Sequence, residues 1–486
     1  MRKEMKPGVW LIVLPTTQFK TTRINVQFLA PLQRATVTKR TLLTSLLETN
    51  SAVYPTQAAL SAHLESLYGA NFSIGVAREG KLHRIGVTMS TVDDRFTDTP
   101  LLPQAAAFLR TILFEPNMQA GSFDEATFAR EKENLDHYLA SLDDDRQTQA
   151  ALGVQQLYFG ADQDQAIPSF GTREDLASLT ASSLATYYQE MMQHDQVVIT
   201  VLGDVDPEQV AALFADWPLD ARSQTVPAVA FDLPTHPDVL TQTTKVNAQQ
   251  AKFDLAYHVE TDLMGPKYAA TLVAEELFGG SSLSLLFTNV REKASLAYYA
   301  SSMFDAFRGL MLVQTGIEGK DRQQVADLIR DQLAAVVNGD FSDALLKAVK
   351  DGILDHQRAA YDSPRFLTNQ ALYQLLVPDA PQNFDEFAQR IKAVDRQAVQ
   401  QAAAAAPEAY ERLINNVLEG DQTNFTHWSE LSASWRFIDA IQAAWSQETE
   451  MPTYPAATMG PQAAFDLLAR DGRQWFWQPR RIKLAD

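Results

Sequence analysis

Two long stretches of the chain repeat the same order of apolar and polar positions. FDEATFAREKENLDHYLASLDDDRQTQAALGVQQLYF, from Phe123, aligns without a gap on FSDALLKAVKDGILDHQRAAYDSPRFLTNQALYQLLV, from Phe341. The alignment pairs similar residues along its whole length: Phe123 with Phe341, Ala126 with Ala344, Lys132 with Lys350, Leu135 with Ile353, Asp144 with Asp362 and Leu157 with Leu375. Each stretch predicts a long amphipathic helix, an Asp-bearing turn and a second helix.

A matching order of elements comes before each stretch. An alternating strand (RINVQFLAPL; AKFDLAYHVE) is followed by an apolar helix (TLLTSLLETN; ATLVAEELFGG), another helix, and further strands. Because a fixed internal repeat indicates a duplicated unit, the chain is predicted to be an α+β protein. We expect two similar halves, each a mixed β-sheet packed with α-helices, and a helical C-terminal tail.

Composition shifts give the domain boundaries. The segment 218–245 contains four prolines and no sustained periodicity, which is typical of a linker. It separates an N-terminal half, 1–217, from a C-terminal half, 246–420. The remaining residues, 421–486, contain five of the seven tryptophans and an amphipathic pattern from Trp428 to Trp445. We expect this tail to dock on the second half, with a partner-binding appendage as the alternative.

Composition and charge narrow the function classes. The 486 residues are 46% hydrophobic and 21% charged, as in folded globular proteins, and the net charge of −19 disfavours nucleic acid and anionic membranes as partners. The absence of cysteine excludes disulfides and thiolate chemistry. The short apolar run near the N-terminus predicts a strand rather than a signal peptide, and no window is long enough to span a membrane. We therefore expect a cytoplasmic protein.

Short motifs exclude several catalytic classes. None of the eight histidines has a second histidine one helical turn away, so neither HExxH nor HxxEH occurs. GVAREGK, from Gly75, lacks the Ser or Thr that follows the P-loop lysine, and it lies between two predicted strands. GGSS, from Gly279, lacks the Gly-x-Ser-x-Gly pattern of a serine hydrolase.

The second half resembles a known family of enzymes. FGGSSLSLLFTNVREKASLAYYASS is similar to the signature of the insulinase/pitrilysin-like zinc peptidases, and the likeness in element order extends over most of residues 8–420. In that family an Arg and a Tyr seven residues later hold the substrate backbone. The resemblance places these substrate-binding roles on Arg291 and Tyr298, and we expect the neighbouring Tyr299 to be a core residue on the opposite strand face.

The resemblance also shows a departure. The family's zinc helix carries HxxEH, and the corresponding positions here are Ser45, Glu48 and Thr49; a further ligand of the family corresponds to Glu131. Neutral hydroxyls are poor zinc ligands and one carboxylate cannot replace three ligands, so these are degenerate zinc-site positions. We expect no bound metal, no cofactor and no catalytic residue in this chain.

Three functions are compatible with these features. The first is a noncatalytic, peptide-binding subunit of a heterodimeric zinc peptidase, whose partner is a homologue that carries HxxEH. Zinc-less bacterial subunits of this type are what the first half resembles, and some are linked to modification of elongation factor P. The second is a scaffold or chaperone-like protein without a role in proteolysis. The third is an active metallopeptidase with unrecognised ligands.

Overall fold

A computed structural model of the chain describes residues 1–404, apart from 161, 223–228, 232–238 and 247, together with residue 470. The chain divides into two compact units, Met1–Glu408 and Ala409–Asp486. The predicted helical tail, 421–486, lies outside the described residues except for residue 470.

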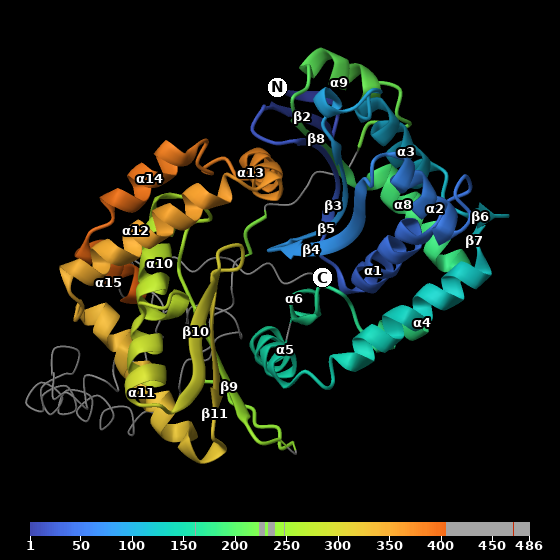
Figure 1. Cartoon of the computed structure of the whole chain (residues 1–486). Coiled ribbons are helices and arrows are strands. Elements are labelled where there is room, and N and C mark those ends of the chain that lie inside the picture. The colour runs from blue at the N-terminus through green and yellow to red at the C-terminus, as the bar shows by residue number, and fades with distance from the viewer. Residues whose placement is uncertain (161, 223–228, 232–238, 247, 405–469, 471–486) are drawn as a thin grey trace, which may run out of the picture. The chain divides into compact units, whose positions relative to one another are not determined.

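The first half is built on a six-stranded sheet with the strand order β1-β2-β8-β3-β5-β4 (Figure 1). β2 and β8 are parallel and the other neighbours are antiparallel. The central strands consist almost entirely of buried residues, which explains their continuous apolar sequences. The strands are β1 (Arg2–Lys6), β2 (Val9–Pro15), β3 (Thr21–Pro31), β4 (Asn71–Glu79), β5 (Leu82–Val92) and β8 (Gln196–Gly203).

Most helices of the first half cover one face of this sheet and enclose its main core (Figure 1). Most begin at a side-chain cap; Thr180 and Ser183 form a capping box at the start of α8. The helices are α1 (Arg34–Thr49), α2 (Gln57–Ser66), α3 (Leu102–Phe114), α4 (Glu125–Ser141), α5 (Arg146–Phe159), α6 (Gln163–Ala166), α7 (Arg173–Ala177), α8 (Ala181–His194) and α9 (Pro207–Phe214). A 3₁₀ turn, η1 (Asp94–Phe96), and a small hairpin, β6 (Met118–Gln119) and β7 (Ser122–Phe123), complete this half.

Among the described residues, the second half has an antiparallel sheet of three strands, ordered β10-β11-β9. Its strands are β9 (Ala251–His258), β10 (Ala297–Asp305) and β11 (Leu310–Ile317). The helical elements of this half are α10 (Pro266–Glu275), α11 (Arg322–Asn338), α12 (Asp343–Ala360), α13 (Pro364–Leu376), α14 (Phe384–Ala393) and α15 (Arg396–Ala404), the π-helical turns η2 (Glu276–Gly280) and η3 (Leu286–Lys293), and the 3₁₀ turn η4 (Gly319–Asp321).

The predicted repeat is confirmed by the element order and by matching contacts. β3, α1, β4, β5, α3, α4 and α5 are followed in the second half by β9, α10, β10, β11, α11, α12 and α13. Lys132 on α4 donates hydrogen bonds to two carbonyl oxygens at the end of α7, over 2.9 and 2.8 Å. Lys350 on α12 makes the same pair of bonds at the end of α14, over 2.8 and 2.7 Å. The α+β fold of two similar halves is therefore confirmed.

The two halves exchange one helix each. α13 of the second half packs on the sheet of the first, where Leu372 joins a buried cluster with Ile12, Leu29 and Val198. α5 of the first half packs on β9 of the second, and Gln147 donates a hydrogen bond to Asp254 over 3.1 Å. This exchange fixes the second half against the first and determines how the candidate site residues are placed.

Candidate functional site

The end of α1 places Ser45, Glu48 and Thr49 on one helix face, because residues three and four positions apart are neighbours there. The side chains of Ser45 and Glu48 are half-buried and Thr49 is buried. The Thr49 hydroxyl donates a hydrogen bond to the carbonyl oxygen of Ser45 over 2.8 Å. The position of one expected ligand is thus occupied by a hydroxyl already engaged with its own helix.

Glu131, on α4, is held by its neighbours. Its side chain is buried, pairs with the Arg130 guanidinium at 2.9 Å, and accepts a hydrogen bond from the Asn134 amide over 3.1 Å. The end of α1 is joined to α4 by a bond from the Asn50 amide to the Thr127 hydroxyl, 2.9 Å long. An arginine therefore supplies the positive charge next to this carboxylate.

Glu48 connects the two helices electrostatically and contacts the sheet. Burial raises the pKa of its carboxyl group, a hydrogen bond from the Ile74 amide lowers it, and the nearby negative charge of Glu131 raises it. The structure thus brings the four degenerate positions, Ser45, Glu48, Thr49 and Glu131, to one place.

This site does not fit zinc. Within the described part of the chain, no group of three or more His, Cys, Asp or Glu side chains could hold a metal ion. The two hydroxyls remain protonated near neutral pH, and Glu131 already has a cationic partner. No catalytic step that depends on zinc follows from these residues.

Arg291 and Tyr298 come together at the start of the second sheet. Arg291 lies on η3, with its guanidinium 4.6 Å from the centre of the Phe287 ring. Its Nε donates a hydrogen bond to the carbonyl oxygen of Tyr298 over 3.1 Å. The guanidinium also pairs with Glu292 at 3.4 Å, and 40% of the Arg291 side chain stays exposed.

A β-bulge presents the Tyr298 side chain to solvent. Ala297 pairs with Ile317 and Tyr299 pairs with Gly316, so Tyr298 is an extra residue in β10. Bulges of this kind redirect a side chain and are common next to binding sites. Tyr298 is 66% exposed, which is unusual for a large aromatic residue.

Tyr299 is not a core residue, and the expectation from strict alternation was wrong. The bulge interrupts the alternation of side chains, and Tyr299 is half-buried. Its hydroxyl donates a hydrogen bond to Gln147 of α5, and the Lys252 ammonium lies 4.9 Å from its ring centre. Tyr299 therefore joins the two halves one residue away from the exposed Tyr298.

The structure thus shows two separate clusters. No contact among the described residues joins the degenerate zinc positions directly to Arg291 or Tyr298. A further feature that the sequence did not single out is β4, the edge strand of the first sheet, whose Ile74 amide bonds Glu48. An edge strand has unpaired backbone groups that can bind an extended peptide.

Comparison with known proteins gives the family. The description "Peptidase M16 inactive domain" matches residues 178–353. A relative from Bacillus subtilis, named "Probable inactive metalloprotease YmfF", is 32% identical over 386 residues, which cover 77% of this chain and 89% of that protein. The chain belongs to the M16 peptidase family. This agrees with the resemblance to insulinase/pitrilysin-like peptidases seen in the sequence.

A solved structure supports the fold. A conserved protein from Enterococcus faecalis V583 is 42% identical and superposes with a TM-score of 0.80, over 84% of this chain and 96% of that one. Among the described residues, no helix combines the length and the apolar character needed to cross a membrane.

The C-terminal segment is similar to a different family. The description "Glucose-6-phosphate dehydrogenase, C-terminal domain" matches residues 377–476. Glucose-6-phosphate 1-dehydrogenase of Streptococcus pneumoniae is 44% identical over 96 residues, which are 20% of this chain and 19% of that enzyme. Since only about a fifth of the enzyme is covered, its activity is not carried over to this M16 chain. The change in composition of this segment is visible in the sequence, whereas this similarity is not apparent from composition or periodicity.

Proposed function

We propose that this M16 chain is a catalytically inactive, peptide-binding subunit that completes the binding chamber of a zinc-bearing M16 partner carrying HxxEH. The observation that carries the proposal is the exposed Tyr298 on its β-bulge, fixed by Arg291. A bulge that turns a phenol toward solvent suits recognition of a ligand, because bulges redirect side chains and are common next to binding sites.

The degenerate site supports the inactive part of the proposal. Hydrolysis in this family requires a metal-bound water, and Ser45, Thr49 and the arginine-paired Glu131 cannot hold the metal. The relative from Bacillus subtilis is itself named a probable inactive metalloprotease. Glu48 then serves the structure, by accepting the Ile74 amide on the edge strand.

The exposed pair supports the peptide-binding part. The Tyr298 hydroxyl and the Arg291 Nη2, which is the guanidinium nitrogen engaged by neither Tyr298 nor Glu292, are hydrogen-bond donors, and a peptide carbonyl is an acceptor. Donors of this kind stabilise negative charge that develops on a carbonyl oxygen when water attacks it. The partner supplies the hydrolytic site, and this chain supplies the donors.

The test is cleavage by a reconstituted pair. The chain is mixed with an HxxEH-bearing M16 homologue from the same organism, and hydrolysis of a quenched fluorescent peptide library is followed. We expect cleavage by the mixture and none by this chain alone. Tyr298→Phe and Arg291→Ala should each lower kcat/KM of the mixture by about 10²-fold, the loss typical of one removed donor.

Matched controls separate binding from folding. Tyr138→Phe changes another exposed tyrosine, 50% exposed on α4. Arg358→Ala removes an arginine that also stacks on a phenylalanine ring and pairs with a nearby carboxylate. Both controls should leave cleavage unchanged. Full activity of the Tyr298→Phe and Arg291→Ala mixtures would refute the assigned role, and a pair that forms without any peptide turnover would favour the scaffold function.

A further inference from the structure

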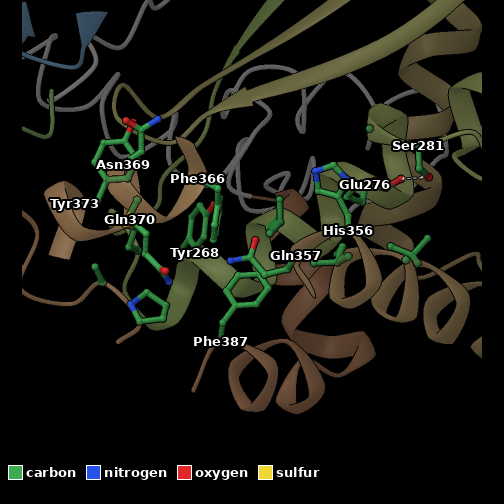
Figure 2. Close-up of a pocket in the computed structure, with 18 of the residues that line it drawn as sticks. Tyr268, Glu276, Ser281, His356, Gln357, Phe366, Asn369, Gln370, Tyr373 and Phe387 are labelled. Carbon is green, nitrogen blue, oxygen red and sulfur yellow. Dashed lines mark hydrogen bonds between the residues drawn. The ribbon is translucent and has the colours of Figure 1, made fainter. Parts of the chain in front are cut away.

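The second half contains an open cavity of about 790 Å³ between α10, η2, α12, α13 and α14. This volume is in the range of small-molecule sites. Figure 2 shows the aromatic rings of Tyr268, Phe366 and Phe387 in the middle of the cavity, with Glu276 and His356 to one side. Apart from Phe387, these aromatic side chains are only half-buried, so their apolar surface faces the cavity.

The cavity lies at the second-half counterpart of the degenerate zinc site. α10 follows β9 as α1 follows β3, and α12 is the repeat partner of α4. In the first half, α1 and α4 bring Glu48 and Glu131 together. In the second half, α10 with η2, and α12, contribute Glu276 and His356 to the cavity wall. The two halves thus have a site at corresponding places in the fold, but the side chains at these two sites differ.

One residue of the repeat leaves part of this space open. Gly352 on α12 corresponds to Asn134 on α4, whose amide fills the space next to Glu131. A Cβ atom at Gly352 would meet no other heavy atom within 4 Å. Glycine inside a helix is destabilising relative to alanine, and here no close packing requires it. A ligand that occupies this space would explain the glycine at position 352.

The charge of the cavity indicates what it binds. Of the described residues that line it, Glu276 is the one with a carboxylate side chain, and none is a lysine or an arginine. The Glu276 side chain is half-buried, and no described residue donates a hydrogen bond to its carboxylate. Burial raises its pKa, and His356 is the neighbour that lowers it. A desolvated carboxylate without a donor is stabilised by a cation, and aromatic rings also attract cations.

We propose that this cavity binds a small organic cation, with a protonated amine that pairs with Glu276 and an apolar body that packs on Tyr268, Phe366 and Phe387. The site is independent of the peptide-binding role, because it shares no residue with Arg291 or Tyr298. The amides of Gln357 and Asn369 provide further polar contacts for the ligand.

The test uses the full chain and a pair of probes that differ in charge, 4-phenylbutylamine and the neutral 4-phenylbutan-1-ol. Binding is followed by NMR of ¹³C-methyl methionine, with the Met264 signal of the cavity wall assigned through Met264→Leu. We expect the amine to shift this signal, and the alcohol to bind about tenfold more weakly, as expected when a charged hydrogen bond is lost.

Two variants locate the site. Glu276→Gln should weaken the amine about tenfold and leave the alcohol unchanged, and Gly352→Leu should abolish binding of both by filling the space. Glu133→Gln, an exposed carboxylate on α4, is the matched control and should have no effect. The proposal is overturned if no amine binding reaches Met264, if amine and alcohol bind equally well, or if Glu276→Gln leaves the affinity of the amine unchanged.

Discussion

Ser45 and Thr49 are the residues that separate this chain from a zinc site. With Glu48 between them, Ser45→His combined with Thr49→His recreates HxxEH on the same helix face. We expect the double variant to retain close to one zinc ion per chain after dialysis, with Glu131 as the third ligand, because metal binding then outweighs the Arg130 ion pair. Elemental analysis measures the zinc content.

The matched control for this prediction adds Glu131→Gln to the double variant. This third change removes a ligand without changing side-chain size, so bound zinc should fall strongly. A double variant with an unchanged circular dichroism spectrum and no bound zinc would show that the position of α4 relative to α1, and not ligand identity, excludes the metal.

Glu275 makes stability depend on pH. It is buried and accepts a hydrogen bond from the Ser302 hydroxyl over 2.7 Å; burial raises its pKa from 4.5 to about 7. Above pH 4.5 the unfolded state loses this proton while the folded state keeps it. The contribution of Glu275 is therefore complete below pH 4.5 and declines by about 3 kcal/mol as pH rises to 7.

Urea unfolding of the wild type and of Glu275→Gln at several pH values measures this effect. The variant keeps the carbonyl that accepts from Ser302 but cannot ionise. Between pH 5 and 8 the unfolding free energy of the wild type should fall relative to that of the variant. A difference that is constant with pH would mean that Glu275 ionises in the folded state as it does in the unfolded chain.

At this scale the sequence names candidate residues but does not give their placement. Arg291 and Tyr298 could be found because their spacing matches the family signature. The bulge that exposes Tyr298 could not, because it depends on the pairing of β10 with β11. The bond between Tyr299 and Gln147 joins residues 152 positions apart, and no local pattern reports such a contact.

At the scale of secondary structure, Gly352 is a point where α12 can be made more stable. Gly352→Ala adds a Cβ atom in open space within a helix, so we expect the free energy of unfolding to rise by about 0.5–1 kcal/mol. Thermal or urea unfolding measures this gain. A matched comparison is Gly339→Ala, where a positive φ of 77° makes the substitution destabilising. Equal effects of the two substitutions would contradict the difference in backbone conformation between Gly352 and Gly339.

The helices α4, α5, α12 and α13 were predictable because long amphipathic patterns with capping residues define them locally. The π-helical turns η2 and η3 were not, since the sequence there is compatible with an ordinary α-helix. The exchange of α5 and α13 between the sheets was also not predictable, because each helix has an apolar face that would suit either sheet.

At the scale of the whole M16 unit, the contact between α13 and the first sheet should control stability. Leu372 is almost fully buried against strands of the other half. Leu372→Ala should destabilise the protein by about 2–4 kcal/mol through lost burial and a residual cavity. Because the contact joins both halves, the urea midpoints measured by fluorescence and by circular dichroism should both fall by the same amount. A shift in only one probe would show that the halves unfold separately.

Function at this scale depends on surfaces that face other molecules. The sequence predicts the lack of zinc ligands but not these surfaces. The loss of the zinc ligands follows from residue types alone. The partner remains a proposal because its recognition depends on surface complementarity, which a single chain does not encode as a pattern. The similarity of residues 377–476 to a dehydrogenase domain could not emerge from periodicity, which reports helices and not ancestry.

The exchange of α5 and α13 has a consequence for how such a protein can evolve. Each half contributes a helix to the sheet of the other, so a gene cut between β8 and β9 would yield two products that each leave an apolar sheet face bare. Such products would be prone to aggregate unless they were made together. The duplicated architecture is therefore inherited as one piece, and new domains are tolerated more readily at its ends than at its middle.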